Sequence, residues 1–122
     1  MNRAYTALSY GIIALGVVHM AATFRFFDAA SQAALWFLSG GLVMVLTGAL
    51  NLLNLSYGGV APGLQRVCIA TNVVISLFAL AAGLVGRASV TELCVIVGLF
   101  VGATVLSALP RAMSGGSKSA AA

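Results

Sequence analysis

The sequence predicts an all-α membrane protein, folded as an antiparallel bundle of four transmembrane helices. Hydrophobic residues make up 61% of the 122-residue chain and charged residues 7%, whereas an ordinary soluble domain carries about 25% charged residues. A soluble protein this short could not bury so much apolar surface, because a large share of its residues must face water. Four apolar runs fill most of the chain, and each approaches the roughly 20 residues that cross a bilayer as a helix.

The four runs are continuously apolar and rich in Ala, Leu and Val, without the alternation of barrel strands, so we expect helices. They cover about residues 8–24, 35–53, 67–85 and 93–109. We expect the first run to remain as a signal-anchor helix, because His19 and Met20 interrupt the small-residue pattern of a cleavage site. Residues 1–110 then form one transmembrane domain, and the polar, small-residue segment 111–122 forms a disordered cytoplasmic tail.

Three connections separate the predicted helices. The first, residues 25–34, lies next to Phe and Trp residues of the kind that gather at a membrane interface. The second, residues 54–66, concentrates Gly, Pro, Asn and Ser, which is a strong loop signal. The third, residues 86–92, is short. Connections of this length favour hairpins between consecutive antiparallel helices.

The basic residues predict the orientation of the bundle. An even number of spans puts both termini and the middle loop on one side. The two sides hold four and two basic residues: Arg3, Arg66, Arg111 and Lys118 against Arg25 and Arg87. By the positive-inside rule, both termini lie in the cytoplasm, as expected of a multi-pass protein of a bacterial inner membrane. The two acids, Asp28 and Glu92, fall on the other side, and we interpret them as interfacial anchors rather than a catalytic pair.

His19 is the one ionisable side chain well inside an apolar run. An ionisable group at membrane depth is energetically costly and suggests a function. His19 could carry protons, contact a quinone or ligate haem. It cannot form a metal site alone, because such sites usually need three or four ligands. The alternative is a neutral histidine that is hydrogen-bonded across a helix interface.

Three asparagines are expected to make polar contacts between helices. Asn51 and Asn54 stand three residues apart near the cytoplasmic end of the second run, and Asn72 lies at a similar depth in the third. Because these helices are consecutive and antiparallel, Asn72 could face either of the other two. Such contacts contribute about 0.6 to 2 kcal/mol each, and replacing Asn51 or Asn72 by Leu is expected to cost about 1 kcal/mol or less. A polar cavity open to the cytoplasm is the alternative interpretation.

Small residues indicate where helices approach closely. Gly98 and Gly102 form a GxxxG pair in the fourth run, which favours tight helix packing without specifying a dimer. Cys68 and Cys94 begin the third and fourth runs, so they should lie near opposite membrane faces, too far apart for a disulfide. We interpret both cysteines as small buried hydrophobic residues.

The sequence lacks the features of several function classes. The net charge of +4 comes from six scattered basic residues, which form no patch for a nucleic acid. No nucleophile elbow, phosphate-binding loop or zinc motif is present. No catalytic residues and no bound metal are therefore expected. The partners expected are the lipid bilayer and either further copies of the chain or a larger membrane complex.

The first 54 residues carry a resemblance to a family. The segment GVVHMAATFRFF followed by LWFLSGGLVMVLTGALNLL resembles small, uncharacterised bacterial four-helix membrane proteins that are broadly DoxX-like. The resemblance implies a four-helix inner-membrane bundle and no particular activity. The positions that it highlights are His19, Trp36, Phe37, Gly41 and Gly48. Small multidrug-resistance transporters are similar in length and span number, but they need an acidic residue in the first span, where this chain has none.

The sequence leaves two functional hypotheses. The first is a non-enzymatic membrane protein, either an accessory component or a small binding component, because no catalytic constellation is present. No cofactor is expected under this hypothesis. The second is a small transporter or a redox-linked protein in which His19 carries protons, contacts a quinone or ligates haem.

Overall fold

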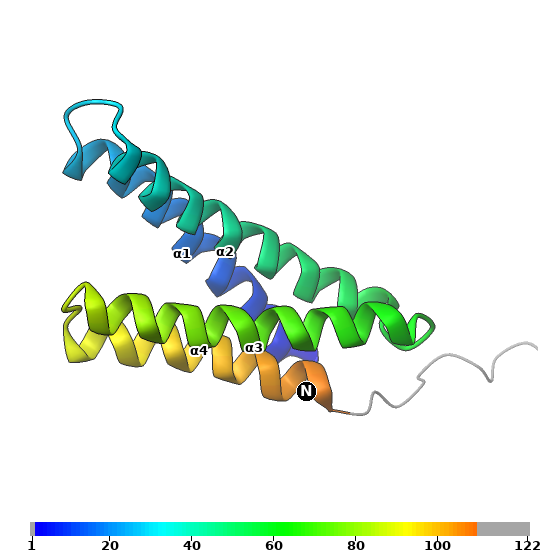
Figure 1. Ribbon diagram of the computed structural model, residues 1–122. Coiled ribbons are helices and arrows are strands. Elements are labelled where there is room, and N and C mark those ends of the chain that lie inside the picture. Colours follow the sequence, from blue (N-terminus) through cyan, green and yellow to red (C-terminus); the bar gives the residue numbers. More distant parts are fainter. Residues whose placement is uncertain (1, 110–122) are drawn as a thin grey trace, which may run out of the picture.

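The structure, a computed structural model, describes residues 2–109. Within this range it consists of four α-helices: α1 (Asn2–Phe26), α2 (Gln32–Tyr57), α3 (Pro62–Val85) and α4 (Val90–Ala108) (Figure 1). The predicted tail, residues 111–122, lies outside the described residues.

All four helices are long and apolar enough to cross a membrane, so the predicted fold class is confirmed. The helices extend beyond the apolar runs at most ends, with α1 beginning at Asn2 and α2 ending at Tyr57. An apolar run marks only the part of a helix that lipid surrounds. The backbone ladder continues through the polar residues of the interface, because each helix satisfies its own backbone groups.

Side-chain caps explain where two of the helices begin. The Ser31 hydroxyl accepts a hydrogen bond from the Ala34 N–H at 3.1 Å at the start of α2. At the start of α4, Ser89 and Glu92 form a capping box: the Ser89 hydroxyl accepts from the Glu92 N–H at 3.2 Å, and the Glu92 carboxylate accepts from the Ser89 N–H at 2.8 Å. These contacts satisfy N–H groups that the first helical turn leaves unpaired. Glu92 is therefore held by its own helix terminus.

The turn between α3 and α4 contains the chain's one described non-glycine residue with a positive φ. Arg87 adopts φ 54° directly after α3. The Arg87 N–H bonds to the carbonyl of Leu84 at 3.4 Å and the Ala88 N–H to that of Gly83 at 2.9 Å. This is the pattern of a Schellman C-cap. Glycine usually occupies the left-handed position of this motif. Here Arg87 occupies that position, and the glycine, Gly86, is the residue before it.

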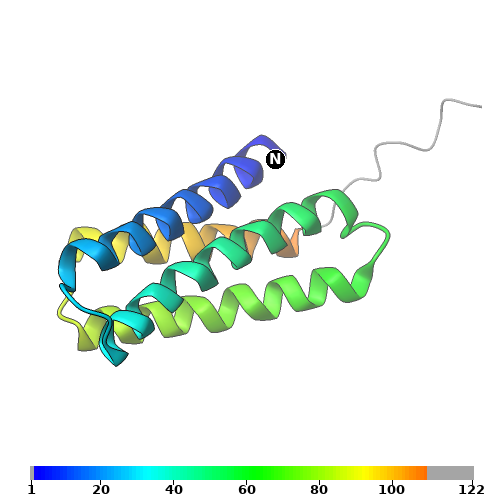
Figure 2. The ribbon, with the colours of Figure 1, turned by 90° about the horizontal axis from the view of Figure 1, so that it is seen from above.

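The four helices form two antiparallel hairpins, α1–α2 and α3–α4. The beginning of α1, the α2–α3 connection and the end of α4 lie at one end of the molecule, which we call the terminal end (Figures 1 and 2). The other two connections lie at the opposite end. The hairpins meet near the terminal end and diverge toward the other, so the molecule is V-shaped in side view.

The distribution of buried residues follows this shape. A small core at the terminal end joins α1 to α4 through Tyr5, Ile12, Phe100 and Ala103. The buried residues of α3 are Cys68 and Asn72, and none of residues 73–99 is buried. The first hairpin therefore does not cover the outer half of the second.

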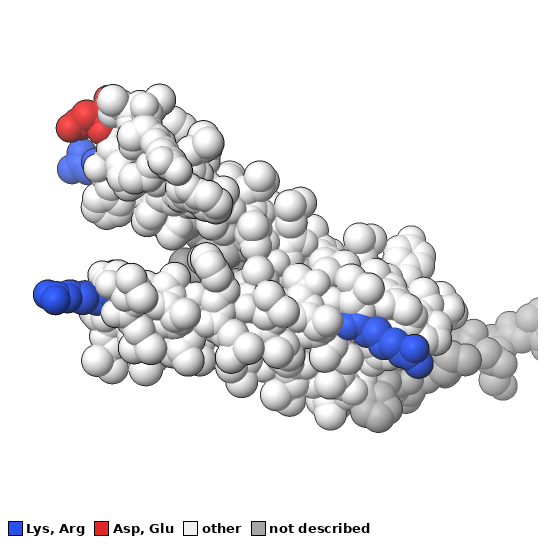
Figure 3. Space-filling view, in the orientation of Figure 1, with Lys and Arg blue, Asp and Glu red and all other residues white. Residues whose placement is uncertain are grey.

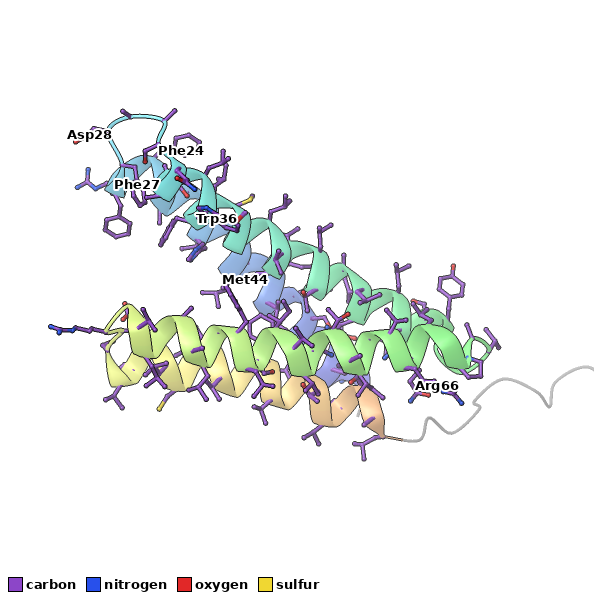
Figure 4. The ribbon with its side chains drawn as sticks, in the orientation of Figure 1. Phe24, Phe27, Asp28, Trp36, Met44 and Arg66 are labelled. Atoms are coloured by element: carbon purple, nitrogen blue, oxygen red, sulfur yellow. The ribbon has the colours of Figure 1, made fainter. Side chains whose placement is uncertain are left out.

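We call the resulting space the wedge. It lies between the diverging outer halves of the two hairpins, and the space-filling view shows it as a deep notch (Figure 3). Met44, on α2, projects toward the second hairpin where the two begin to diverge (Figure 4), and it packs against the edge of the core.

Within the first hairpin, glycines bring α1 and α2 into backbone contact. A Cβ placed on Gly16 would lie 2.6 Å from the carbonyl oxygen of Gly41, and one placed on Gly41 would lie 2.7 Å from that of Gly16. Further along α2, a Cβ on Gly48 would lie 2.7 Å from the carbonyl oxygen of Ser9. No larger residue fits at these three positions without moving a helix. Such close approach is how helices associate where lipid removes the hydrophobic drive.

Candidate functional site

The most buried polar side chains of the described chain gather at the terminal end. Asn51 of α2 and Asn72 of α3 form a reciprocal amide pair, in which each Nδ2 donates to the Oδ1 of the other at 2.8 Å. Both side chains are fully buried. The second amide hydrogen of Asn51 is also used, because its Nδ2 donates to the Thr47 carbonyl at 2.8 Å. The pair joins the two hairpins directly.

Tyr5 of α1 adds a third helix to this pair. Its hydroxyl donates to Asn51 Oδ1 at 2.6 Å and accepts from Asn54 Nδ2 at 3.1 Å. The Cys68 thiol donates to the same Asn51 oxygen at 3.4 Å, and its sulfur lies 3.6 Å from the Tyr5 hydroxyl. We call the set Tyr5, Asn51, Asn54, Cys68 and Asn72 the polar lock.

The polar lock has the chemistry of a structural contact. Its members are amides, a phenol and a thiol, each at most 2% exposed. The one thiol among them, Cys68, is fully buried and therefore closed to any substrate. In lipid, hydrogen bonds of this kind hold helices together, at about 0.6 kcal/mol each on average.

His19 lies on the face of α1 that bears Tyr5 and Ile12. The three residues are spaced by seven, which is two helical turns within about 20°. Tyr5 and Ile12 pack against α4 in the core. Two turns further on, the hairpins have separated, and the same face of α1 forms a wall of the wedge. His19 is accordingly only partly buried, about 10 Å along the helix axis from Phe26 at the end of α1.

The imidazole of His19 is held against α2. It stacks on the ring of Phe37, with ring centroids 4.0 Å apart and the planes at 17°. A Cβ on Gly40 would lie 3.3 Å from His19 Nε2, so glycine allows this nitrogen to pack closely against α2. Phe26 and Phe27 surround the other sides of Phe37, with centroids at 6.1 and 5.7 Å. The result is an aromatic cluster with one polar edge.

The described residues hold no cluster suited to a metal ion. No three of their His, Cys, Asp and Glu side chains come together. Cys68 and Cys94 are both free thiols. His19 could supply one axial ligand to a haem, and a second ligand would have to come from another molecule. A polar contact to a lipid-soluble ring needs only the groups already present, His19 and Phe37.

The structure places the other predicted residues as follows. Asn54 lies in the polar lock but bonds to Tyr5, while Asn72 faces Asn51. Gly102 lies against α1, since a Cβ there would be 3.1 Å from Leu8 Cδ1. A Cβ on Gly98 would meet nothing within 4 Å, because no helix of the described residues covers that side of α4, and a packing role for Gly98 stays a prediction.

The expectation that Cys94 is buried is corrected by the structure. Cys94 is exposed, whereas Cys68 is buried, because the first turns of α4 border the wedge and the lipid rather than the core. Of the positions that the family resemblance highlights, Phe37 contacts His19, while Gly41 and Gly48 contact α1. Trp36 is exposed and contributes to neither contact.

Two residues that make these helix contacts, Tyr5 and Gly16, were not predicted from the sequence. Tyr5 precedes the predicted first span, so it was not considered as a buried residue. Its spacing of seven from Ile12 and fourteen from His19 is the signal that could have found it. Gly16 was likewise missed, although its partner Gly41 was noted.

Comparison with protein-family models, with curated proteins and with solved structures finds no match to this chain.

Proposed function

We propose that this chain is a small, non-enzymatic binding component of a bacterial inner membrane, which takes a lipid-soluble molecule from the bilayer into the wedge. The observation that carries the proposal is the stacked His19–Phe37 pair on the wedge wall, 4.0 Å between centroids. A binding site for a small molecule is typically apolar with a few placed polar groups. The aromatic cluster with its single imidazole has this composition.

The orientation forms part of the proposal. Arg3 and Arg66 belong to the terminal end, and Arg25 and Arg87 to the open end of the wedge; the remaining basic residues, Arg111 and Lys118, lie outside the described residues. With both termini in the cytoplasm, the wedge opens in the outer half of the inner membrane. The DoxX-like resemblance supports the same setting, and two of its positions, His19 and Phe37, are the pair on the wedge wall.

The single tryptophan of the chain offers a direct test of binding. Trp36 immediately precedes Phe37 and is 71% exposed, so a bound quinone ring would quench its fluorescence. A short-chain ubiquinone is titrated into the protein in nanodiscs. We expect saturable quenching by the native chain and about tenfold weaker binding for His19→Ala or Phe37→Leu, which corresponds to about 1.4 kcal/mol of lost contact.

The matched control is Tyr10→Leu. Tyr10 is 59% exposed and lies on α1 nearer the terminal end than the wedge, so this substitution removes an exposed aromatic ring outside the wedge and should leave binding unchanged. Quenching that rises linearly with ubiquinone, without saturation and without a difference between the variants, would mean that the quinone merely partitions into the lipid. The proposed ring contact would then be wrong.

A second candidate function is redox or transport chemistry that uses His19. It is favoured by the incomplete burial of His19, which leaves part of an ionisable side chain open to a proton, a quinone oxygen or a haem iron. A haem would give the purified protein a Soret band that is lost in His19→Ala, and a colourless preparation would remove haem. Proton-coupled uptake in liposomes that is indifferent to His19→Ala would remove the proton carrier.

A further inference from the structure

We propose that the two hairpins are rigid bodies that rock about the polar lock, so that the wedge opens and closes within the bilayer. The inference concerns the protein without any ligand, and it does not depend on what the wedge binds. It follows from three features: the packing inside each hairpin, the position of the contacts between hairpins, and the composition of the wedge walls.

Each hairpin is tightly packed on its own. In α1–α2, the reciprocal approach of Gly16 and Gly41 brings backbone against backbone in the outer half, and Gly48 repeats the contact nearer the terminal end. In α3–α4, the contact is between a side chain and a helix, because Leu93 packs against Gly83 beside the turn. Closely packed helices resist bending, because any movement creates overlap or a void. Each pair of helices should therefore move as one body.

The contacts between the hairpins lie at one end only. The polar lock joins α2 and α3 through Asn51 and Asn72, and the core joins α1 and α4 through Ile12 and Phe100. Beyond them, none of residues 73–99 is buried. Two rigid bodies that are fastened at one end have one soft degree of freedom, which is rotation about the fastened end. This is hinge motion.

The contacts across the wedge do not fix the distance between the two hairpins. The described polar groups of the wedge are few, and the hydrogen bonds of Thr23 and Ser39 go to carbonyls of their own helices. Between the described walls no hydrogen bond crosses the wedge, so closing or opening it breaks none. Lipid tails can replace apolar side-chain contacts at little change in free energy, since they are equally apolar. The opening is then governed by side-chain volume where the hairpins begin to diverge, which Met44 supplies.

Distances between spin labels in nanodiscs test the motion on the full chain. The native Cys94 on α4 carries one label. Phe24→Cys on α1 places the second label across the wedge, whereas Leu84→Cys places it within the second hairpin; all three positions are exposed. We expect a broad or two-peaked distance distribution across the wedge and a narrow one within the hairpin. Equal widths for the two pairs would overturn the proposal.

A further pair locates the hinge. Tyr10→Cys on α1 and Val105→Cys on α4, both exposed, join the hairpins near the terminal end in a Cys94→Ala background. A narrow distribution is expected here, and a distribution as broad as that across the wedge would place the hinge elsewhere and overturn the proposal. Cys68 is fully buried and should not react with the label. The variant Cys94→Ala, which retains only Cys68, should therefore take up no label, and this is the control for all three pairs.

Two substitutions should move the wedge in opposite ways. Met44→Ala removes volume where the hairpins diverge and should shift the Cys94–Phe24 distances toward shorter values, whereas Met44→Trp should shift them toward longer ones. The Tyr10–Val105 pair should not change in either variant. If neither substitution shifts the distances across the wedge, the opening is fixed by something other than a hinge and the proposal fails.

Discussion

Asn51 is the residue on which the joining of the two hairpins should depend most. Its side chain makes three interhelical hydrogen bonds to nitrogen or oxygen, one with Tyr5 at 2.6 Å and two with Asn72 at 2.8 Å. At about 0.6 kcal/mol each in a membrane, these sum to about 2 kcal/mol. Asn51→Leu also leaves the buried amide of Asn72 without its partner, and an unsatisfied buried group costs about 1–3 kcal/mol.

We therefore expect Asn51→Leu to lower the free energy of unfolding by about 3–5 kcal/mol, measured by reversible unfolding in mixed micelles. The expectation from sequence, about 1 kcal/mol or less, considered a single contact. The control is Ser56→Ala, which removes an exposed hydroxyl bonded to the Leu52 carbonyl of its own helix and should change stability by less than about 0.5 kcal/mol.

The double variant Asn51→Leu/Asn72→Leu sharpens the test. It removes both halves of the amide pair and leaves apolar side chains facing each other. Its cost should be smaller than the sum of the two single variants, because each single variant strands the other amide. A loss below about 1 kcal/mol for Asn51→Leu, or costs that simply add, would refute the view that the pair is a buried, mutually satisfied contact.

Three further predictions concern local packing and caps. Gly16→Ala should lower the free energy of unfolding by about 1–3 kcal/mol, because the added methyl group overlaps the facing α2 carbonyl. Gly98→Ala is the control and should change the free energy of unfolding by less than about 0.5 kcal/mol. Equal effects of the two substitutions in the same unfolding assay would contradict the close approach of α1 and α2 at Gly16. Arg87→Gly should raise stability by about 0.5–1 kcal/mol, because glycine adopts φ 54° without strain, and a loss would count against the turn. Ser89→Ala should cost about 1 kcal/mol and Ser89→Asp much less, since aspartate also caps helices; equal costs would mean that the capping box with Glu92 contributes little.

The sequence was sufficient for the membrane environment and the four helices, because lipid demands long apolar helices and leaves few alternatives. It also placed Asn51 and Asn72 at a similar depth on adjacent antiparallel helices, which is the geometry that their pairing needs. These features depend on periodicity and order along the chain, and both can be read from one sequence.

Other features depend on how the helices are rotated and inclined, which composition does not encode. The GxxxG spacing of Gly98 and Gly102 is the same whether the helix face meets a neighbour or lipid, and only Gly102 meets one. The divergence of the hairpins follows from contacts confined to one end, so neither the wedge nor the position of His19 on its wall could be anticipated. Tyr5 was missed because it precedes the apolar run at residues 8–24, whereas the helix itself begins at Asn2.

The most direct test of the four crossings is the location of the two chain ends. Paired reporters, one fluorescent only in the cytoplasm and one enzymatically active only outside it, are fused in turn to the N-terminus and the C-terminus of the full chain in bacterial cells. Both fusions should report the cytoplasm. Ends on opposite sides of the membrane would require an odd number of crossings and would contradict the four-helix arrangement.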